Sequence, residues 1–286
     1  MLQPYFNGKA RYTYLVGAAK SGTTKLADLL DLHPDVSLAK GKEPDTFAIH
    51  EVNESSLQQY DALFDSTSSV RVDASTSYTE TSETVDIANR LFKVDSSAKI
   101  IYLVRDPAKR AWSSYWHYIR NGVEKGEPLE AISSPTSPHF NGSCYYQQLS
   151  AIAEVFPKTQ IRVLFFEDFV KNTDDVFQQL LTFLSLSPVD MQQGETEKTK
   201  NKSYQWRGAA SVLKHVNPVH IQKVTKFLKR VLPGQIIASI KNSATKPVPS
   251  LDEKTYAQLH VLFEEDFCKL QSEFADCFLV SQHWKK

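Results

Sequence analysis

The chain has 286 residues, and its 41% hydrophobic and 11% aromatic content is enough for a sizeable buried core. Its 33 basic and 33 acidic residues cancel, so the composition provides no general attraction to nucleic acid or to a membrane surface. The cysteines, Cys144, Cys268 and Cys277, are too few and too scattered for a metal cage or a disulfide framework.

The first predicted element is an apolar strand over residues 12–17, which ends at Gly17. Beyond a short loop, apolar side chains recur at helical spacing, which predicts a helix over residues 22–33. The free backbone N–H groups and the positive dipole end at the start of such a helix attract an anion. The loop adds an ammonium group and several hydroxyl groups, so we expect a phosphate cradle made of Lys20, Ser21, Gly22, Thr23 and Thr24.

This loop differs from the nucleotide-binding pattern GxxxxGK[ST] in the position of its lysine. Gly17 and Gly22 have the spacing of the two glycines, but Thr23 occupies the lysine position. The usual lysine reaches the β- and γ-phosphates, and the hydroxyl after it holds magnesium. Lys20 lies inside the turn, which suits a shorter anion at a 5′ position. A nucleoside-triphosphate kinase with the same cradle stays an alternative.

A short strand over residues 35–38 is predicted next, followed by a helix over 55–64. A second short strand over 70–74 is followed by a helix over 80–92. A charged turn with Lys42 and Glu43 follows the first of these strands, and Asp73 lies at the end of the second. In open α/β sheets, ligands bind beyond the carboxyl ends of the strands. These three charged side chains are therefore candidates for a ligand site.

The strand predicted over residues 99–104 ends in Arg105, and the Asp-Pro pair after it is typical of a helix start. Helical spacing continues over residues 107–121, which places Ser113 two turns along that helix. A guanidinium at the strand end and a hydroxyl on the helix can hold a second phosphate from two sides.

The remaining pattern continues the alternation of strands and helices up to about residue 187. A helix over residues 144–155, a strand over 160–166 and a helix over 172–185 are predicted there. Such alternation indicates an α/β fold with a central parallel sheet flanked by helices on both faces.

The C-terminal third differs in character from this core. The pattern predicts an exposed polar loop over residues 188–206 and a helix over 207–232. A rigid connector is predicted over 246–250, and a second helix over 252–274. We expect a single domain over residues 1–286, with an α/β nucleotide-binding core over 1–187 and a loop and helical part over 188–286.

The two phosphate sites together resemble those of the sulfotransferases that use 3′-phosphoadenosine 5′-phosphosulfate (PAPS). The run Lys20-Ser-Gly-Thr-Thr resembles their 5′-phosphosulfate loop, and Arg105 with Ser113, eight residues later, resembles their 3′-phosphate site. The resemblance implies the P-loop-like fold of that family, PAPS as the donor, adenosine 3′,5′-bisphosphate as the product, and no metal. In this family Lys20 would hold the leaving 5′-phosphate.

The resemblance is closer to glycan-type and bacterial members than to the cytosolic enzymes that act on phenols and steroids. Those cytosolic enzymes use a histidine on the strand that corresponds to residues 70–78, where this chain has none. Lys42-Glu43 resembles the Lys-Glu segment of the glycan-type members, which implies Glu43 as general base and Lys42 as an aid to the transferring group. Asp73 is the alternative base, and Thr76 replaces the proline of the glycan-type motif.

The family's adenine-contacting loop lies in the C-terminal third, and the matching residues here are Tyr204, Arg207 and Gly208. The resemblance implies transfer to a hydroxyl or amine of a small-molecule or glycan acceptor. A kinase, or a module that binds the bisphosphate without catalysis, remains an alternative function.

The N-terminal segment has no apolar stretch long enough for a signal peptide or a membrane anchor. The sequence therefore predicts a cytoplasmic enzyme, as does the odd number of cysteines, which suits a reducing compartment. Asn-x-Ser sequons at Asn53, Asn141 and Asn201 keep open the alternative of a Golgi-lumen enzyme whose anchor has been removed.

Overall fold

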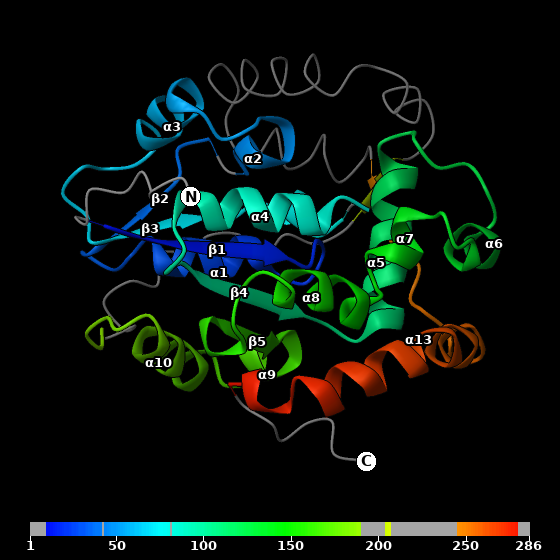
Figure 1. Cartoon of the computed structure of the whole chain (residues 1–286). Coiled ribbons are helices and arrows are strands. Elements are labelled where there is room, and N and C mark those ends of the chain that lie inside the picture. The colour runs from blue at the N-terminus through cyan, green and yellow to red at the C-terminus, as the bar shows by residue number, and fades with distance from the viewer. Residues whose placement is uncertain (1–9, 42, 81, 190–203, 207–244, 280–286) are drawn as a thin grey trace, which may run out of the picture.

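The computed structural model describes residues 10–279, apart from residues 42, 81, 190–203 and 207–244. A five-stranded sheet forms its centre, with all strands parallel and in the order β2-β3-β1-β4-β5 (Figure 1). The strands are β1 (Arg11–Gly17), β2 (Val36–Leu38), β3 (Val70–Asp73), β4 (Lys99–Val104) and β5 (Ile161–Phe165). Every bound lies within one residue of its sequence prediction, and the predicted fold class is confirmed.

Both faces of the sheet are covered, which is why its strands are nearly continuous apolar runs. Successive side chains of a strand point to opposite faces, so Tyr14 and Leu15 of β1 belong to two separate cores. Helices that contribute to the Tyr14 core are α2 (Thr46–Ile49), α3 (Glu54–Asp61), α4 (Thr84–Val94) and α8 (Tyr145–Ala153). Helices on the Leu15 side are α1 (Thr23–Leu30), α9 (Phe166–Lys171) and α10 (Thr173–Phe183).

A third apolar cluster lies next to the end of the sheet where β4 finishes. It joins α5 (Pro107–Arg120), α6 (Pro128–Ser133), α7 (Pro138–Asn141) and α13 (Glu253–Glu273). Figure 1 shows α5 standing at this end of the sheet, with α13 crossing below it. The cluster packs against one face of α5, and the opposite face of α5 is turned toward the loops that follow the strands.

Some boundaries differ from the sequence predictions. Helix α1 ends at Leu30 rather than at residue 33, because Pro34 disfavours helical backbone at the residue before it. The imidazole of His33 is instead buried, with Nε2 3.0 Å from the Ser187 carbonyl oxygen. The helix predicted over 172–185 begins as α10 at Thr173, directly after the separate helix α9.

The largest difference lies in the C-terminal third. Strand β6 (Tyr204–Trp206) pairs antiparallel with β7 (Thr245–Pro247), where the sequence predicts an exposed loop and a rigid connector. Each strand has only three residues, and the hydrogen bonds that define it come from a partner far along the chain, so neither has a local signal.

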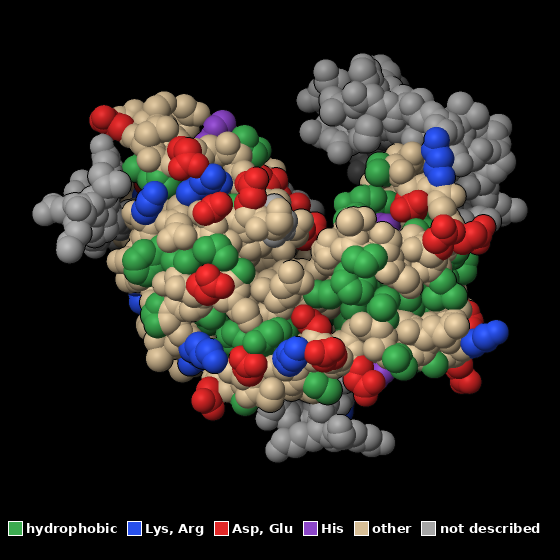
Figure 2. Space-filling view, turned by 45° about the vertical axis from the view of Figure 1, so that its right-hand side comes forward, with side chains coloured by type: hydrophobic (Ala, Val, Ile, Leu, Met, Phe, Trp, Pro, Cys, Tyr) green, Lys and Arg blue, Asp and Glu red, His purple; other side chains and the backbone are tan. Residues whose placement is uncertain are grey.

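Acidic and basic side chains are mixed over the face seen in Figure 2, as a net charge of zero leads one to expect. In the part of the chain that the structure describes, no helix combines the length and the apolar character needed to cross a membrane.

Candidate active site at the ends of β1 and β4

The crevice between β1 and β4 is the point where the chain connections diverge. From β1 the chain passes through α1 toward β2 at one edge of the sheet, whereas from β4 it leads to β5 at the other edge. Such a switch point is where open α/β sheets bind their ligands. The Lys20 loop and Arg105 follow the two strands that border it.

The Lys20 loop turns sharply into α1 because two of its residues have left-handed backbone. Gly22, the N-cap of α1, has φ +91°, and Lys20 has φ +71°. The Ser21 N–H donates to the Ala18 carbonyl at 3.1 Å, so that amide, which the sequence assigned to the phosphate, serves the loop itself. The N–H groups of Gly22, Thr23 and Thr24 have no acceptor within the helix, as at any helix start. Any anion site at this helix start would therefore use the amides of Gly22, Thr23 and Thr24 rather than that of Ser21.

The three hydroxyl groups of the loop differ in exposure. Ser21 is fully buried, Thr23 is buried, and Thr24 is partly exposed. Only Thr24 thus presents appreciable surface at the start of α1.

The structure brings Lys20 and Arg105 together. Arg105 Nη1 donates to the Lys20 carbonyl at 3.4 Å, and its guanidinium lies over the Phe166 ring, 5.1 Å from the centroid. Arg105 Nε is buried and has no hydrogen-bond partner among the described residues. A buried donor without an acceptor is costly, so this nitrogen is a place where an anion would be stabilised.

Ser113 lies on the face of α5 that is turned toward the loop. It stands three residues after Arg110, whose Nε donates to the Ala19 carbonyl at 2.9 Å. It stands four residues before His117, whose Nδ1 lies 3.4 Å from Lys20 Nζ. Because residues three and four apart share a helix face, Ser113 lies on the same face of α5 as Arg110 and His117, and its role in binding stays a prediction.

Glu43 lies in the loop after β2, which is held against the loop after β3. Glu43 and Asp45 have φ values of +55° and +52°, unusual for residues other than glycine. The Asp45 N–H donates to Ser75 Oγ at 3.0 Å, and Ser77 Oγ donates to the Asp45 carboxylate at 2.5 Å. These two bonds fix the turn that presents the half-buried Glu43.

Asp73, the alternative base, has no exposed surface. Its carboxylate accepts hydrogen bonds from Ser75 Oγ at 2.6 Å and from the hydroxyls of Tyr60 and Tyr78 at 2.7 Å each. Burial raises the pKa of this carboxyl, and the three donors oppose that shift. Ser75 Oγ donates to the Asp73 carboxylate and accepts from the Asp45 N–H, so Asp73 helps to hold the turn at Asp45.

Two further residues lie next to these candidates: Glu80, which has no sequence signal, and Arg110, which shares the Ser113 face of α5. Arg110 is 1% exposed and is ion-paired with Glu80, with Nη2 2.5 Å from Oε1. Burial raises the pKa of Glu80, nearby Arg110 and Lys20 lower it, and nearby Glu43 raises it. Glu43 and Lys20, which follow different strands, thus lie within electrostatic reach of one carboxylate.

Four predicted contacts cannot be placed. Lys42, Arg207 and Gly208 lie outside the described residues, and Tyr204 belongs to β6, whose backbone alone is described. Their roles stay predictions.

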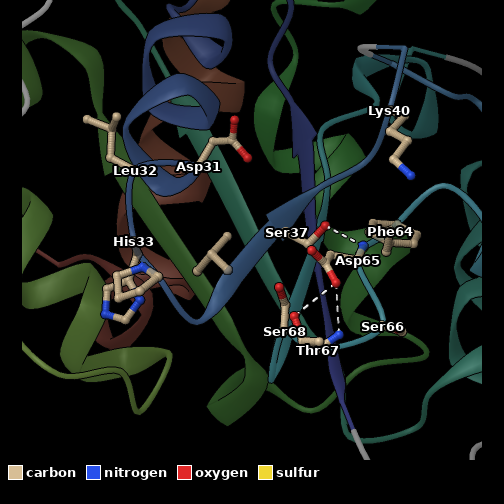
Figure 3. A pocket seen from close by; sticks show the side chains of 12 residues that line it. Asp31, Leu32, His33, Ser37, Lys40, Phe64, Asp65, Ser66, Thr67 and Ser68 are labelled. Carbon is tan, nitrogen blue, oxygen red and sulfur yellow. Dashed lines mark hydrogen bonds between the residues drawn. The ribbon is translucent and has the colours of Figure 1, made fainter.

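A shallow depression of about 690 Å³ lies at the opposite end of the strands (Figure 3). Its lining includes His33, Ser37 and Ser68 and comes mostly from segments that precede or form the start of β2 and β3, with Lys40 from the segment after β2. None of the candidate site residues lines it.

Replacing Gly22 with alanine tests the loop geometry. A Cβ there would lie 2.8 Å from the Phe166 ring on left-handed backbone, so we expect a loss of about 2–4 kcal/mol in the free energy of unfolding. Gly41→Ala is the matched control, because Gly41 has φ +101° but nothing within 4 Å of its Cβ position. Urea unfolding of both variants measures the difference. Equal losses would contradict the close contact with Phe166.

A family model described as "Sulfotransferase domain" matches residues 11–235. Heparan sulfate glucosamine 3-O-sulfotransferase 5 of Mus musculus and of Homo sapiens is 25% identical over 187 residues, which are 61% of this chain and 53% of each relative. The chain therefore spans about half the length of these curated relatives.

Among solved structures, a sulfotransferase from Alicyclobacillus acidocaldarius matches with a TM-score of 0.63 at 18% identity, over 93% of this chain and 96% of that one. This likeness shows a common fold. Because the family model covers most of the chain, from β1 beyond β5, the chain belongs to the sulfotransferase family.

Proposed function

We propose that the chain transfers a sulfuryl group from PAPS to a hydroxyl or amine of a small-molecule or glycan acceptor. The observation that carries the proposal is the junction of the two predicted phosphate sites, where Arg105 donates to the Lys20 carbonyl across the switch point. Membership of the sulfotransferase family supports the reaction class. The similarity to heparan sulfate 3-O-sulfotransferases favours a glycan hydroxyl among the acceptors.

The donor groups at the crevice suit a ligand with two separate anionic ends. The Lys20 ammonium and the first amides of α1 suit the 5′-phosphosulfate. The unpartnered Arg105 Nε and the Ser113 hydroxyl suit the 3′-phosphate, which distinguishes PAPS from ordinary nucleotides.

In the proposed transfer, the acceptor oxygen or nitrogen forms a bond to sulfur as the bond from sulfur to the 5′-phosphate oxygen breaks. The electron pair of the broken bond stays on the phosphate, where Lys20 offsets the charge, and the acceptor proton passes to the base. The products are the sulfated acceptor and adenosine 3′,5′-bisphosphate. Positioning and charge stabilisation are the main tasks left to the protein.

The surroundings favour Glu43 over Asp73 as the base. Glu43 is half-buried, and both Glu43 and Lys20 lie within electrostatic reach of Glu80. Asp73 is fully enclosed, and three hydroxyl groups already donate to it. A general base must come within hydrogen-bond reach of the acceptor proton, which an enclosed carboxylate does not.

Calorimetric titration with adenosine 3′,5′-bisphosphate tests the donor. Arg105→Ala is expected to weaken bisphosphate binding by about ten- to a hundredfold, because charge-assisted hydrogen bonds are lost. Lys93→Ala, which removes an exposed cation at the end of α4, is the control and should bind normally.

A parallel titration with ATP and magnesium separates the alternatives. Binding of ATP-magnesium alone would contradict the proposal and favour a kinase. Tight bisphosphate binding without transfer to any acceptor tested would favour a non-catalytic module.

A further inference from the structure

Arg110 combines nearly complete burial with four hydrogen bonds to acceptors in three segments of the chain. Its Nε donates to the Ala19 carbonyl at 2.9 Å, and its Nη2 donates to Glu80 Oε1 at 2.5 Å. Its Nη1 donates to the carbonyls of Pro138 and His139 at 3.1 and 3.2 Å. One guanidinium therefore joins the Lys20 loop, the segment after β3, and α7 to α5.

Stability alone is a poor explanation of this arrangement. Removing a guanidinium from water is expensive, and an apolar residue of similar volume is often as good or better for stability. What an apolar residue lacks is the planar fork of N–H donors that fixes several acceptors in one geometry.

The acceptor that matters most is the Ala19 carbonyl, because it belongs to the peptide group that joins Ala19 to Lys20. Peptide groups are planar, so fixing that oxygen fixes the plane from which the Lys20 φ of +71° is measured. Left-handed backbone at a residue other than glycine is strained and persists only where the surroundings impose it. The Arg110 bond is such a constraint, one residue before Lys20.

We propose that Arg110 is a positioning residue for the donor loop: by holding the Ala19–Lys20 peptide, it keeps the Lys20 ammonium and the first amides of α1 directed at one anion. Its partner Glu80 fixes the guanidinium from the side of β3 and lies within reach of both Lys20 and Glu43. The inference rests on the proposed function, in which this loop binds the 5′ end of PAPS.

Gly142 offers a way to move Arg110 without changing any charge. A Cβ at Gly142 would overlap both Nη atoms of Arg110, and its φ of −68° suits alanine. Gly142→Ala therefore acts on the guanidinium by contact alone. Gly126→Ala is the matched control, because its Cβ would come no closer than 3.3 Å, to the side-chain oxygen of Glu124.

The experiment measures the Kd for adenosine 3′,5′-bisphosphate and the melting temperature of each variant of the full chain. Gly142→Ala is expected to raise the Kd about tenfold, the effect of one lost hydrogen bond to a charged group, while Gly126→Ala leaves it unchanged. Arg110→Lys keeps the charge but not the fork, so the Kd should rise there too. In an Arg110→Met background Gly142→Ala should cost no further affinity, since the clashing group is absent.

Unchanged bisphosphate affinity in Gly142→Ala and in Arg110→Lys, even with lowered melting temperatures, would overturn the inference and leave Arg110 a purely structural residue. If Gly142→Ala fails to fold, Arg110→Lys decides between these results. Failure of the wild-type chain itself to bind the bisphosphate would overturn the proposed donor as well. Normal wild-type binding with normal variant binding contradicts only the role of Arg110.

Discussion

Lys20→Ala is expected to remove nearly all sulfuryl transfer, lowering kcat by about 10²–10³-fold, the usual cost of deleting one group that stabilises charge in the transition state. Negative charge grows on the 5′-phosphate oxygen as its bond to sulfur breaks, and Lys20 is the full positive charge in the loop at the switch point. Release of adenosine 3′,5′-bisphosphate from PAPS in the presence of an acceptor measures the rate.

Lys25→Ala is the control for this variant. Lys25 lies in the first turn of α1, is exposed, and has its Nζ over the Phe169 ring, 5.4 Å from the centroid. Lys25→Ala removes the same charge from a nearby position outside the loop, so the kcat of this variant should stay near that of the wild type. Equal losses in the two variants would mean that net charge, rather than the position of Lys20, governs the reaction.

Glu43→Gln is expected to lower kcat by about 10²–10⁴-fold, the typical contribution of a general base, and to leave bisphosphate affinity unchanged. Glutamine keeps the size and hydrogen-bonding capacity of glutamate but does not take up the acceptor proton. Single-turnover rates with bound PAPS measure the chemical step, and calorimetry measures the affinity.

Glu51→Gln is the matched control, because Glu51 is exposed and its ion pair is with Arg90, away from the crevice. Intact turnover in Glu43→Gln would rule out the proposed base. Weakened bisphosphate binding without a change in kcat would instead place Glu43 at the donor.

The parts of the fold that the sequence predicted well are those with a repeating local pattern. Strand β4 is an apolar run buried on both faces, and the Asp-Pro pair after it starts α5 as expected, with the Asp106 carboxylate accepting from the Lys109 N–H at 2.9 Å. Parallel strands end at the same edge of a sheet, so residues after β1, β2 and β4 were expected to share one site.

The features that the sequence missed depend on where a side chain points and on hydrogen-bond partners far away in the chain. Lys109 and Arg110 are neighbours of like charge on α5, yet Lys109 is exposed and Arg110 is buried. No local pattern distinguishes them, because the acceptors of Arg110 come from other loops. The sequence also does not show the burial of Asp73. Its position at a strand end suggests a base, but in the structure three hydroxyl groups donate to its carboxylate and enclose it.

The sequence by itself determined the five strands of the central sheet and several of the helices between them, and it indicated residues near the carboxyl ends of the strands that suit two phosphates. Hydrophobic periodicity and helix-start signals are local, so a single chain contains them in full. Only the tertiary structure decided that Arg105 meets the Lys20 loop, that the Ser21 amide turns inward, and that Arg110 joins the loop to Glu80. These contacts join residues far apart in the chain, and they form only once both faces of the sheet are packed.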